Sequence, residues 1–296
     1  MIFIAGATGF VGSHLIDALL KEGHQLRCLV RSEKTAKSFH EKGIEVVRGD
    51  ITEPDTIQGA LKDINFVIHL VGIIEEKGSV TFQRVHVDGT KNLVNEAKQT
   101  GVKHFFYQSA LEADRGSWSG YLRTKAEAEE IVKASDIPYT VFRPSLIIGP
   151  WDGFTKRLMD IVKMSPVIIP VPGDGKTKFQ PIYIKDWIIC LLKVLSSPEL
   201  FSGIFEIGGP EHLTYNEIVS SLAKAMKIKK SILHMPMRLL KLGAALAEKT
   251  IPVLPVTYDQ LRLLENDNIC DKDSVEKHFG FRPMGYKEAL SEFVRT

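Results

Sequence analysis

Cysteine is scarce in this sequence of 296 residues, which holds three: Cys28, Cys190 and Cys270. Because they are odd in number and far apart, they predict neither a disulfide framework nor a metal site. Cys28 and Cys190 lie in apolar runs, where a small buried hydrophobe is the expected role. Cysteine usage of this kind favours a reducing compartment, so we predict a cytoplasmic location.

Long apolar runs and an excess of charge of one sign are also missing. The longest apolar stretches, 66–74 and 187–195, are too short for a membrane helix and are interrupted by His69 and Lys193. No targeting segment is expected, because Met1 leads straight into a short strand and a glycine loop. With 38 Lys+Arg against 36 Asp+Glu, the net charge of +2 gives no general attraction to nucleic acid. We therefore expect neither a nucleic-acid partner nor a transmembrane segment.

In the first half of the chain, short apolar runs alternate with helical periodicity. Strand-like runs occupy 2–5, 25–30, 45–48, 66–70, 104–108 and 140–143, and helical patterns occupy 11–22, 90–100 and 121–135. Alternating β and α elements with continuously apolar strands predict an α/β fold. Its expected form is a doubly wound parallel Rossmann sheet with helices on both faces.

The pattern changes after Pro150. Prolines and glycines crowd residues 166–175, which predicts neither a regular strand nor a helix there. The runs 187–195 and 203–207 return to a helix and a strand, and 214–226, 237–249 and 286–293 are helical. We expect an NAD(P)-binding domain of 1–150 plus about 181–209. A small, discontinuous, mostly helical substrate lobe would take about 151–180 plus 210–296.

A glycine loop joins the first strand to the first helix. Gly6 would allow the tight turn, Gly9 would let the backbone approach a pyrophosphate, and Gly12 would let helix and strand pack closely. Free amides at the helix N-terminus would then hold the phosphate charge. The residues predicted to bind the dinucleotide here are Gly6, Thr8, Gly9, Phe10, Val11 and Gly12.

The end of the second strand indicates which dinucleotide binds. Arg31 and Ser32 stand where an acidic residue would hold the ribose of NAD. A guanidinium pairs with a 2′-phosphate and gains nothing from a bare hydroxyl, which favours NADP(H) over NAD(H). The alternative is that Arg31 is a solvated charge at a strand end. Further residues expected along the nucleotide are Asp50, placed for the adenine amine, Ile51, Leu70, Val71 and Gly72.

Tyr121 and Lys125 form a candidate acid/base pair. Their i, i+4 spacing places them on one face of a helix, where an ammonium would lower the tyrosine pKa from about 10. Lys125 could also hold the hydroxyls of the nicotinamide ribose. An ordinary surface pair on a helix is the alternative.

These motifs resemble the extended and atypical short-chain dehydrogenase/reductases, which include the NAD-dependent epimerases and dehydratases. The glycine loop, Tyr121 with Lys125, and the run that begins at Arg143 follow the family's order over nearly the whole chain. Within the family the chain is most similar to bacterial relatives of the NAD(P)H-binding accessory subunit of respiratory complex I. The segments that carry this likeness are 85–90, 108–111, 121–129, 179–186, 208–211 and 267–268.

The resemblance implies a substrate held between a Rossmann domain and the C-terminal lobe. It also implies nicotinamide contacts from Pro144, Ser145 and Leu146. As in many relatives, helices 90–100 and 125–135 could form a homodimer through a four-helix bundle.

Two positions depart from the family pattern. Ala110 stands where relatives carry a catalytic Ser or Thr, so Ser109, Ser117 or Ser119 would have to take that role. His86 stands where relatives usually have Asn, and it could relay a proton and contact the cofactor or could be a packed helix residue. The tyrosine–lysine pair is unaffected.

Three functions are compatible with these residues. The leading hypothesis is an NADP(H)-dependent oxidoreductase that transfers hydride to or from a small apolar carbonyl, alcohol or quinone-like substrate, with Tyr121, Lys125 and Ser109 as catalytic residues. Nucleotide-sugar epimerisation or dehydration is an alternative within the same family. A non-catalytic NAD(P)H-binding assembly or sensor protein is the other.

Peripheral membrane contact through residues 235–249 is a further hypothesis. This stretch is apolar with basic residues at its edges. A helix packed on the C-terminal lobe has the same pattern and is the favoured interpretation.

Overall fold

The structure is a computed structural model that describes residues 1–247 and 258–294. The chain divides into two compact units. One consists of Met1–Arg143 and Ile188–Phe205, and the other of Pro144–Trp187 and Glu206–Thr296.

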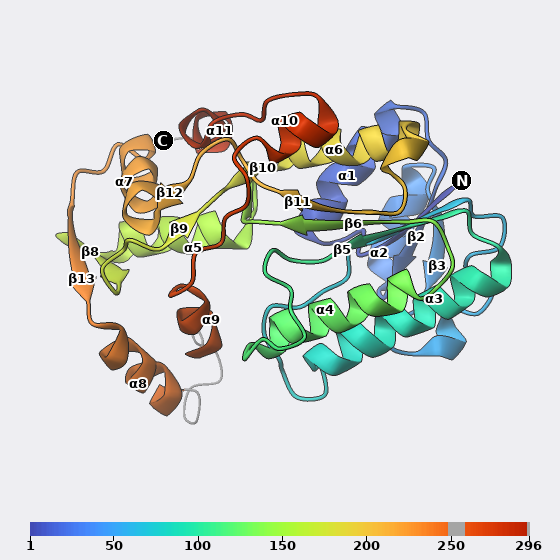
Figure 1. Cartoon of the computed structure of the whole chain (residues 1–296), viewed down its shortest axis with the longest axis horizontal. Coiled ribbons are helices and arrows are strands. Elements are labelled where there is room, and N and C mark those ends of the chain that lie inside the picture. The colour runs from blue at the N-terminus through green and yellow to red at the C-terminus, as the bar shows by residue number, and fades with distance from the viewer. Residues whose placement is uncertain (248–257, 295–296) are drawn as a thin grey trace. The chain divides into compact units, whose positions relative to one another are not determined.

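A seven-stranded sheet is the centre of the fold (Figure 1). Its order is β11-β6-β5-β4-β1-β2-β3, and the pairs from β6 to β3 are parallel. The predicted doubly wound α/β fold is confirmed. The strands are β1 (Ile2–Ala5), β2 (Leu26–Val30), β3 (Glu45–Arg48), β4 (Phe66–His69), β5 (His104–Gln108), β6 (Tyr139–Pro144) and β11 (Gly203–Ile207).

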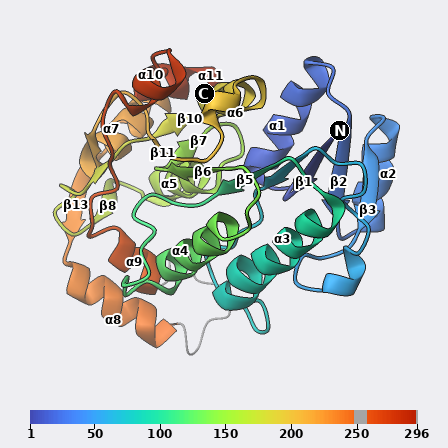
Figure 2. The same cartoon turned by 45° about the vertical axis from the view of Figure 1, so that its right-hand side comes forward.

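Helices cover both faces of this sheet, which explains its continuously apolar strands. Alternate strand residues such as Phe3 and Val67 belong to one buried cluster with side chains of α3 and α4. Phe106 and Phe142 have the opposite parity and pack edge to face, with ring centroids 4.8 Å apart. Figures 1 and 2 show α3 (Gly89–Thr100) and α4 (Gly120–Lys133) on one face, and α1 (Phe10–Lys21) and α6 (Ile184–Ser196) on the other.

Local signals in the sequence set the ends of the two helices nearest the candidate site. Ser119 caps α4 by accepting a hydrogen bond from the Leu122 amide, and Gly101 ends α3 in the left-handed region with a φ of 71°. A π-helical turn, η2 (Gln83–Asp88), runs directly into α3. α2 (Glu33–Glu41) and two 3-10 turns, η1 (Pro54–Thr56) and η3 (Pro198–Leu200), complete the elements of the first unit.

The second unit mixes helices with short two-stranded sheets. Its elements are β7 (Ile147–Ile148), α5 (Gly153–Met164), β8 (Ile168–Pro172), β9 (Lys178–Phe179), β10 (Ile182–Tyr183), β12 (Leu213–Thr214), α7 (Tyr215–Ala225), β13 (Ser231–Met235), α8 (Met237–Ala247), α9 (Tyr258–Leu263), α10 (Ser274–Phe279) and α11 (Tyr286–Phe293). β7 pairs with β10, β9 with β12, and β8 with β13.

The prediction that residues 166–175 contain no regular strand is wrong, because β8 pairs in parallel with β13. Gly173 donates its amide to the carbonyl of Met235. The amides of the alternate positions Ile169 and Val171 therefore also point toward β13. Pro170 and Pro172 have the opposite parity. Their missing N–H groups therefore fall on the open side of β8, where a strand tolerates proline.

Within the apolar stretch 235–249, Met235 ends β13 and Met237–Ala247 form α8, while residues 248 and 249 lie outside the described part. α8 packs against α9, in line with the favoured interpretation, but Leu239 and Leu242 remain 64% and 59% exposed. None of the described helices is long and apolar enough to cross a membrane.

Candidate functional site

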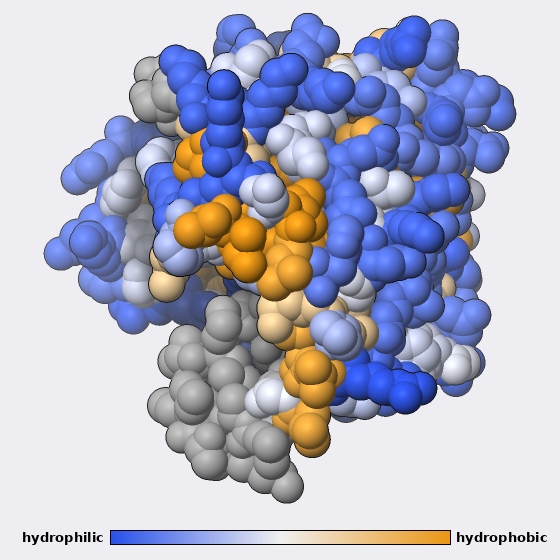
Figure 3. Space-filling view, turned by 90° about the vertical axis from the view of Figure 1, so that its left-hand side faces the viewer, coloured by the Kyte–Doolittle hydropathy of each residue, from blue (hydrophilic) through white to orange (hydrophobic). Residues whose placement is uncertain are grey.

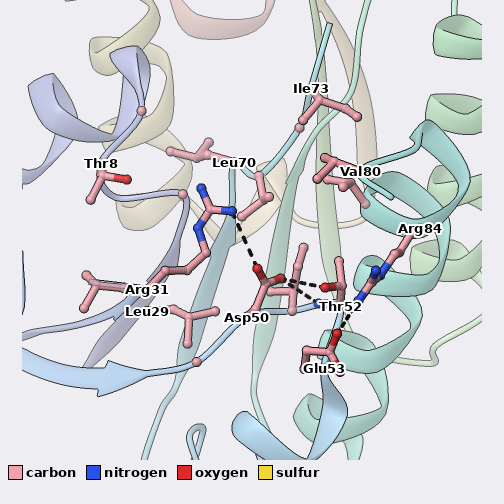
Figure 4. Close-up of a pocket in the computed structure, with 18 of the residues that line it drawn as sticks. Thr8, Leu29, Arg31, Asp50, Thr52, Glu53, Leu70, Ile73, Val80 and Arg84 are labelled. Atoms are coloured by element: carbon pink, nitrogen blue, oxygen red, sulfur yellow. Dashed lines mark hydrogen bonds and ion pairs between the residues drawn. The ribbon is translucent and has the colours of Figure 1, made fainter. Parts of the chain in front are cut away.

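A cavity of about 410 Å³ opens in the first unit beside the ends of β1, β2 and β4 (Figure 4). In parallel sheets this edge is where ligands bind, because the strand ends and helix N-termini meet there. The predicted nucleotide residues that line the cavity are Gly6, Thr8, Gly9, Arg31, Asp50, Ile51, Leu70, Val71 and Gly72.

The glycine loop is shaped so that side chains would not fit. A Cβ on Gly6, whose φ is +96°, would lie 2.9 Å from the Leu70 carbonyl carbon, and one on Gly12 would lie 2.2 Å from the Gly6 oxygen. α1 begins at Phe10, after an N-cap residue, Gly9, that offers no side-chain cap. Its first-turn amides, including those of Phe10 and Val11, are therefore suited to an anion such as a pyrophosphate.

Arg31 lies at the edge of the cavity with its side chain 79% exposed. One of its nitrogens is 3.6 Å from a carboxylate oxygen of Asp50, which is only a loose ion pair. Arg31 can therefore turn toward a phosphate at little cost. The hydroxyl of Ser32 accepts a hydrogen bond from the Thr35 amide at 3.2 Å, so that it caps α2.

Part of the cavity wall was not identified from the sequence. The amide and hydroxyl of Thr52 donate to one oxygen of Asp50 at 2.9 and 3.0 Å, which fixes that carboxylate (Figure 4). Arg84 and Glu53 form an ion pair on the same side of the cavity. An Asp two residues before a Thr is a turn signal that could have located Thr52. The sequence around Arg84 holds no comparable signal that would place it at the cavity.

Lys125 connects α4 to the cavity. Its Nζ donates to the carbonyl of Gln108 at 2.7 Å and lies 4.9 Å from the centre of the Tyr107 ring. A Cβ on Gly72, a residue of the cavity wall, would lie 3.3 Å from that Nζ. The lysine therefore approaches the cavity edge just where Gly72 leaves room.

Tyr121 lies one turn before Lys125 and packs its ring edge on His86, with centroids 5.6 Å apart. Burial raises the pKa of Tyr121 to about 12, and burial lowers the pKa of Lys125 to about 7. The predicted lowering of the tyrosine pKa is therefore wrong for the chain alone. The reason is that the same burial disfavours both the phenolate and the ammonium that would stabilise it.

His86 has both ring nitrogens engaged. Its Nε2 accepts the amide hydrogen of Ile73 at 3.0 Å, so the proton of the neutral ring is on Nδ1, which lies 2.9 Å from the Thr124 hydroxyl. Thr124 in turn donates to the carbonyl of Gly120 at 2.7 Å. Burial, followed by the charge of Lys125, lowers the pKa of His86 far below its usual range. These contacts fit a residue that holds the cavity loop against α4 better than a proton relay.

Among the described residues, no hydrogen bond joins the Tyr121 side chain to the candidate serines Ser109, Ser117 and Ser119. The Ser109 side chain is buried, and its hydroxyl has no partner among the described residues. Ser119 caps α4, and the hydroxyl of Ser117 accepts the Ser119 amide at 3.2 Å. A serine donor for catalysis remains a prediction.

Pro144, Ser145 and Leu146 belong to the second unit. There the Ser145 hydroxyl donates to Asn268 oxygens, at 2.7 and 2.9 Å, and its amide donates to Ile207. The Leu146 carbonyl accepts from Ile182. Their predicted contacts to a nicotinamide stay a prediction.

Comparison with known proteins identifies the family. The sequence pattern of the NAD(P)H-binding family matches residues 6–154, which include the glycine loop, the cavity wall, Tyr121 and Lys125. The chain belongs to the NAD(P)H-binding family. The predicted nucleotide-binding relationship is thereby confirmed.

Two relatives in this family are similar over most of the chain. A ceramide reductase of Caulobacter vibrioides is 31% identical over 238 residues, which are 80% of this chain and 74% of that protein. The mitochondrial NADH dehydrogenase [ubiquinone] 1 alpha subcomplex subunit 9 of Arabidopsis thaliana is 26% identical over 92% of this chain and 71% of its own. The second match confirms the predicted likeness to the complex I accessory subunit.

The fold of the family extends to solved structures. A nucleoside-diphosphate-sugar epimerase from Staphylococcus aureus superposes with a TM-score of 0.77, at 18% identity, over 98% of this chain and 99% of its own. At this identity the likeness shows the fold alone, and it agrees with the Rossmann architecture expected from the sequence.

Proposed function

We propose that this protein is an NADPH-dependent reductase of the short-chain class that acts on a small, apolar carbonyl compound. The observation that carries the proposal is the position of Lys125. Its Nζ lies beside Gly72 at the edge of the cavity that the glycine loop lines, and Tyr121 precedes it by one helical turn. A protein that only binds a nucleotide needs neither group at that spacing.

The preference for NADPH rests on Arg31. Its exposed guanidinium has only a loose pairing with Asp50, and a 2′-phosphate would offer it a bidentate, charge-assisted contact. Asp50, held by Thr52, would then face the adenine amine. NADH would give Arg31 only a hydroxyl.

A bound nicotinamide would supply the hydride, and the chain's own residues would supply the proton. With a pKa raised to about 12, Tyr121 keeps its proton at neutral pH and releases it only to a strongly basic oxygen, such as the alkoxide that hydride addition creates. Lys125, with its pKa lowered to about 7, can both hold a ribose hydroxyl and return a proton near neutrality. These values fit an acid that works in the direction of reduction.

We infer that the first unit binds the nucleotide and the second contributes the substrate contacts. The reductase name of the Caulobacter relative supports an oxidoreductase, and the lipid in that name supports an apolar substrate. The cytoplasmic location and the homodimer stay predictions.

The test is NADPH oxidation with a panel of apolar aldehydes, ketones and quinones. Tyr121→Phe should lower turnover at least a hundredfold and change NADPH affinity less than threefold, since a general acid contributes on the order of 10² to 10⁴. Tyr139→Phe, a half-buried tyrosine of the same unit, is the matched control and should retain turnover. Equal turnover by Tyr121→Phe would refute the assigned role.

A second candidate is a non-catalytic NAD(P)H-binding subunit. The observation that favours it is the buried Ser109 hydroxyl, which leaves Tyr121 without the usual serine partner in the described part. The complex I subunit of Arabidopsis is a relative that would fit this function. Tight NADPH binding without oxidation by any member of the panel would favour this candidate.

A further inference from the structure

One face of the second unit carries exposed apolar side chains that form a strip. Met164 and Val167, at the connection from α5 to β8, are 83% and 70% exposed, and Leu233 of β13 is 49% exposed. Leu239 and Leu242 of α8 continue the strip. Figure 3 shows apolar residues gathered on this face. We call these five residues the apolar strip.

One residue of the strip, Leu233, lies on the outer side of the sheet that β8 and β13 form. Ile169 and Val171 of β8 are buried, with 2% and 0% exposure, so the inner side already packs against the unit. Leu233 pairs in register with Pro170, which has the opposite parity to those two residues and points outward with it. The unit's own core covers only one side of this sheet, so the other apolar side stays exposed.

The segment of chain that carries Leu233, Leu239 and Leu242 is basic, although Lys241 forms an ion pair with Glu265. Residues 218–247 contain no Asp or Glu. The cations in this stretch are Lys224, Lys227, Lys229, Lys230, Arg238 and Lys241.

Two of these cations are available to a partner. Lys227 and Lys229 are exposed and form no ion pair among the described residues. Lys230 donates to the carbonyls of Val162 and Ser165, which ties a cation to the connection that carries Met164. A cavity of about 390 Å³, lined in part by these three lysines, lies beside them.

We propose that the apolar strip docks on the surface of an anionic lipid bilayer. Exposed leucine, valine and methionine side chains can enter the boundary between headgroups and acyl chains, and cations beside them attract anionic headgroups. A second copy of the chain is a poorer occupant, because a two-fold contact would bring the same lysines of both copies together. This inference does not depend on the proposed reductase activity.

Vesicle flotation of the full chain tests the proposal. Vesicles of phosphatidylcholine with roughly a third phosphatidylglycerol should carry the protein upward, and phosphatidylcholine alone should carry much less. High salt should release it. Each cation near an anionic surface strengthens binding about fivefold, so Lys227→Glu with Lys229→Glu should weaken it at least tenfold.

Matched variants separate the strip from general effects. Leu239→Ser with Leu242→Ser should weaken vesicle binding at least tenfold, while Ile74→Ser, at a residue of the first unit that is 61% exposed, should not. Lys21→Glu with Lys103→Glu reverses two exposed lysines of the first unit and should change binding less than the pair at Lys227 and Lys229. Circular dichroism confirms that each variant is folded.

Three results would overturn the proposal. One is no flotation with anionic vesicles, and another is equal flotation with neutral and anionic vesicles. The third comes from light scattering without lipid. If the unaltered chain is a dimer that the double leucine variant converts to a monomer, the strip is a contact between copies.

Discussion

Replacing Lys125 by methionine should stabilise the nucleotide-free chain at acidic pH and lose that advantage at alkaline pH. The Lys125 side chain is 5% exposed, and burial lowers its pKa from 10.5 to about 7. Below pH 7 the lysine is charged in both the folded and the unfolded chain. The folded chain then bears the full cost of burying the charge.

The magnitude follows from the two pKa values. One pKa unit corresponds to about 1.4 kcal/mol, so the buried charge costs roughly 5 kcal/mol. Methionine removes this cost but also removes the donor to the Gln108 carbonyl, at 2.7 Å in the structure. Losing that hydrogen bond costs about 1–3 kcal/mol. The net expectation is a variant about 3 kcal/mol more stable near pH 6.

Between pH 7 and 10.5 the unfolded chain binds more protons than the folded one, so the stability of the unaltered chain rises with pH. By about pH 9 the cost of the buried lysine charge has fallen by roughly 3 kcal/mol. The free energies of unfolding of Lys125→Met and of the unaltered chain should then be nearly equal.

Urea unfolding followed by far-UV circular dichroism at the two pH values measures the effect. Lys103→Met, at an exposed lysine, is the control and should change stability by less than about 0.5 kcal/mol at either pH. If Lys125→Met changes the free energy of unfolding by the same amount at both pH values, the lysine titrates normally. Burial would then not lower the pKa of Lys125.

Further predictions concern the nucleotide cavity. Arg31→Gln should weaken NADPH binding by roughly 10- to 100-fold and leave NADH within about twofold in calorimetry; equal losses for both nucleotides would contradict the assigned contact. His86→Ala should lower the free energy of unfolding by about 2 kcal/mol, because the Ile73 amide loses its acceptor, and unchanged urea unfolding would refute this. Gly12→Ala should abolish NADPH binding, since its Cβ would meet backbone at 2.2 Å, whereas Gly153→Ala, with no atom within 4 Å, should not; retained binding by the first variant would argue against a rigid loop.

Much of the nucleotide end could be predicted because its signals are local. The strand, the spaced glycines and the following helix are adjacent in the sequence, and Gly6 and Gly12 show the close approaches that their spacing implies. Arg31 and Asp50 follow strands whose ends must meet at one edge of a parallel sheet. The sheet order then placed both on the same cavity.

The rest depends on contacts between distant segments. The sequence placed Tyr121 and Lys125 on one helix face but did not reveal how strongly the surrounding chain shields them from water. That shielding raises the pKa of Tyr121 and lowers the pKa of Lys125. The second nitrogen of His86 is taken by Thr124, 38 residues away, and its first by Ile73. β8 was missed because proline statistics do not tell which side of a strand stays open.

Calorimetric titration of the unaltered, nucleotide-free chain with NADPH and NADH tests the central claim most directly. We expect NADPH to bind at least tenfold more tightly than NADH, since only NADPH offers Arg31 a phosphate. Equal affinities, tighter binding of NADH, or no binding of either nucleotide would contradict the account of the cavity.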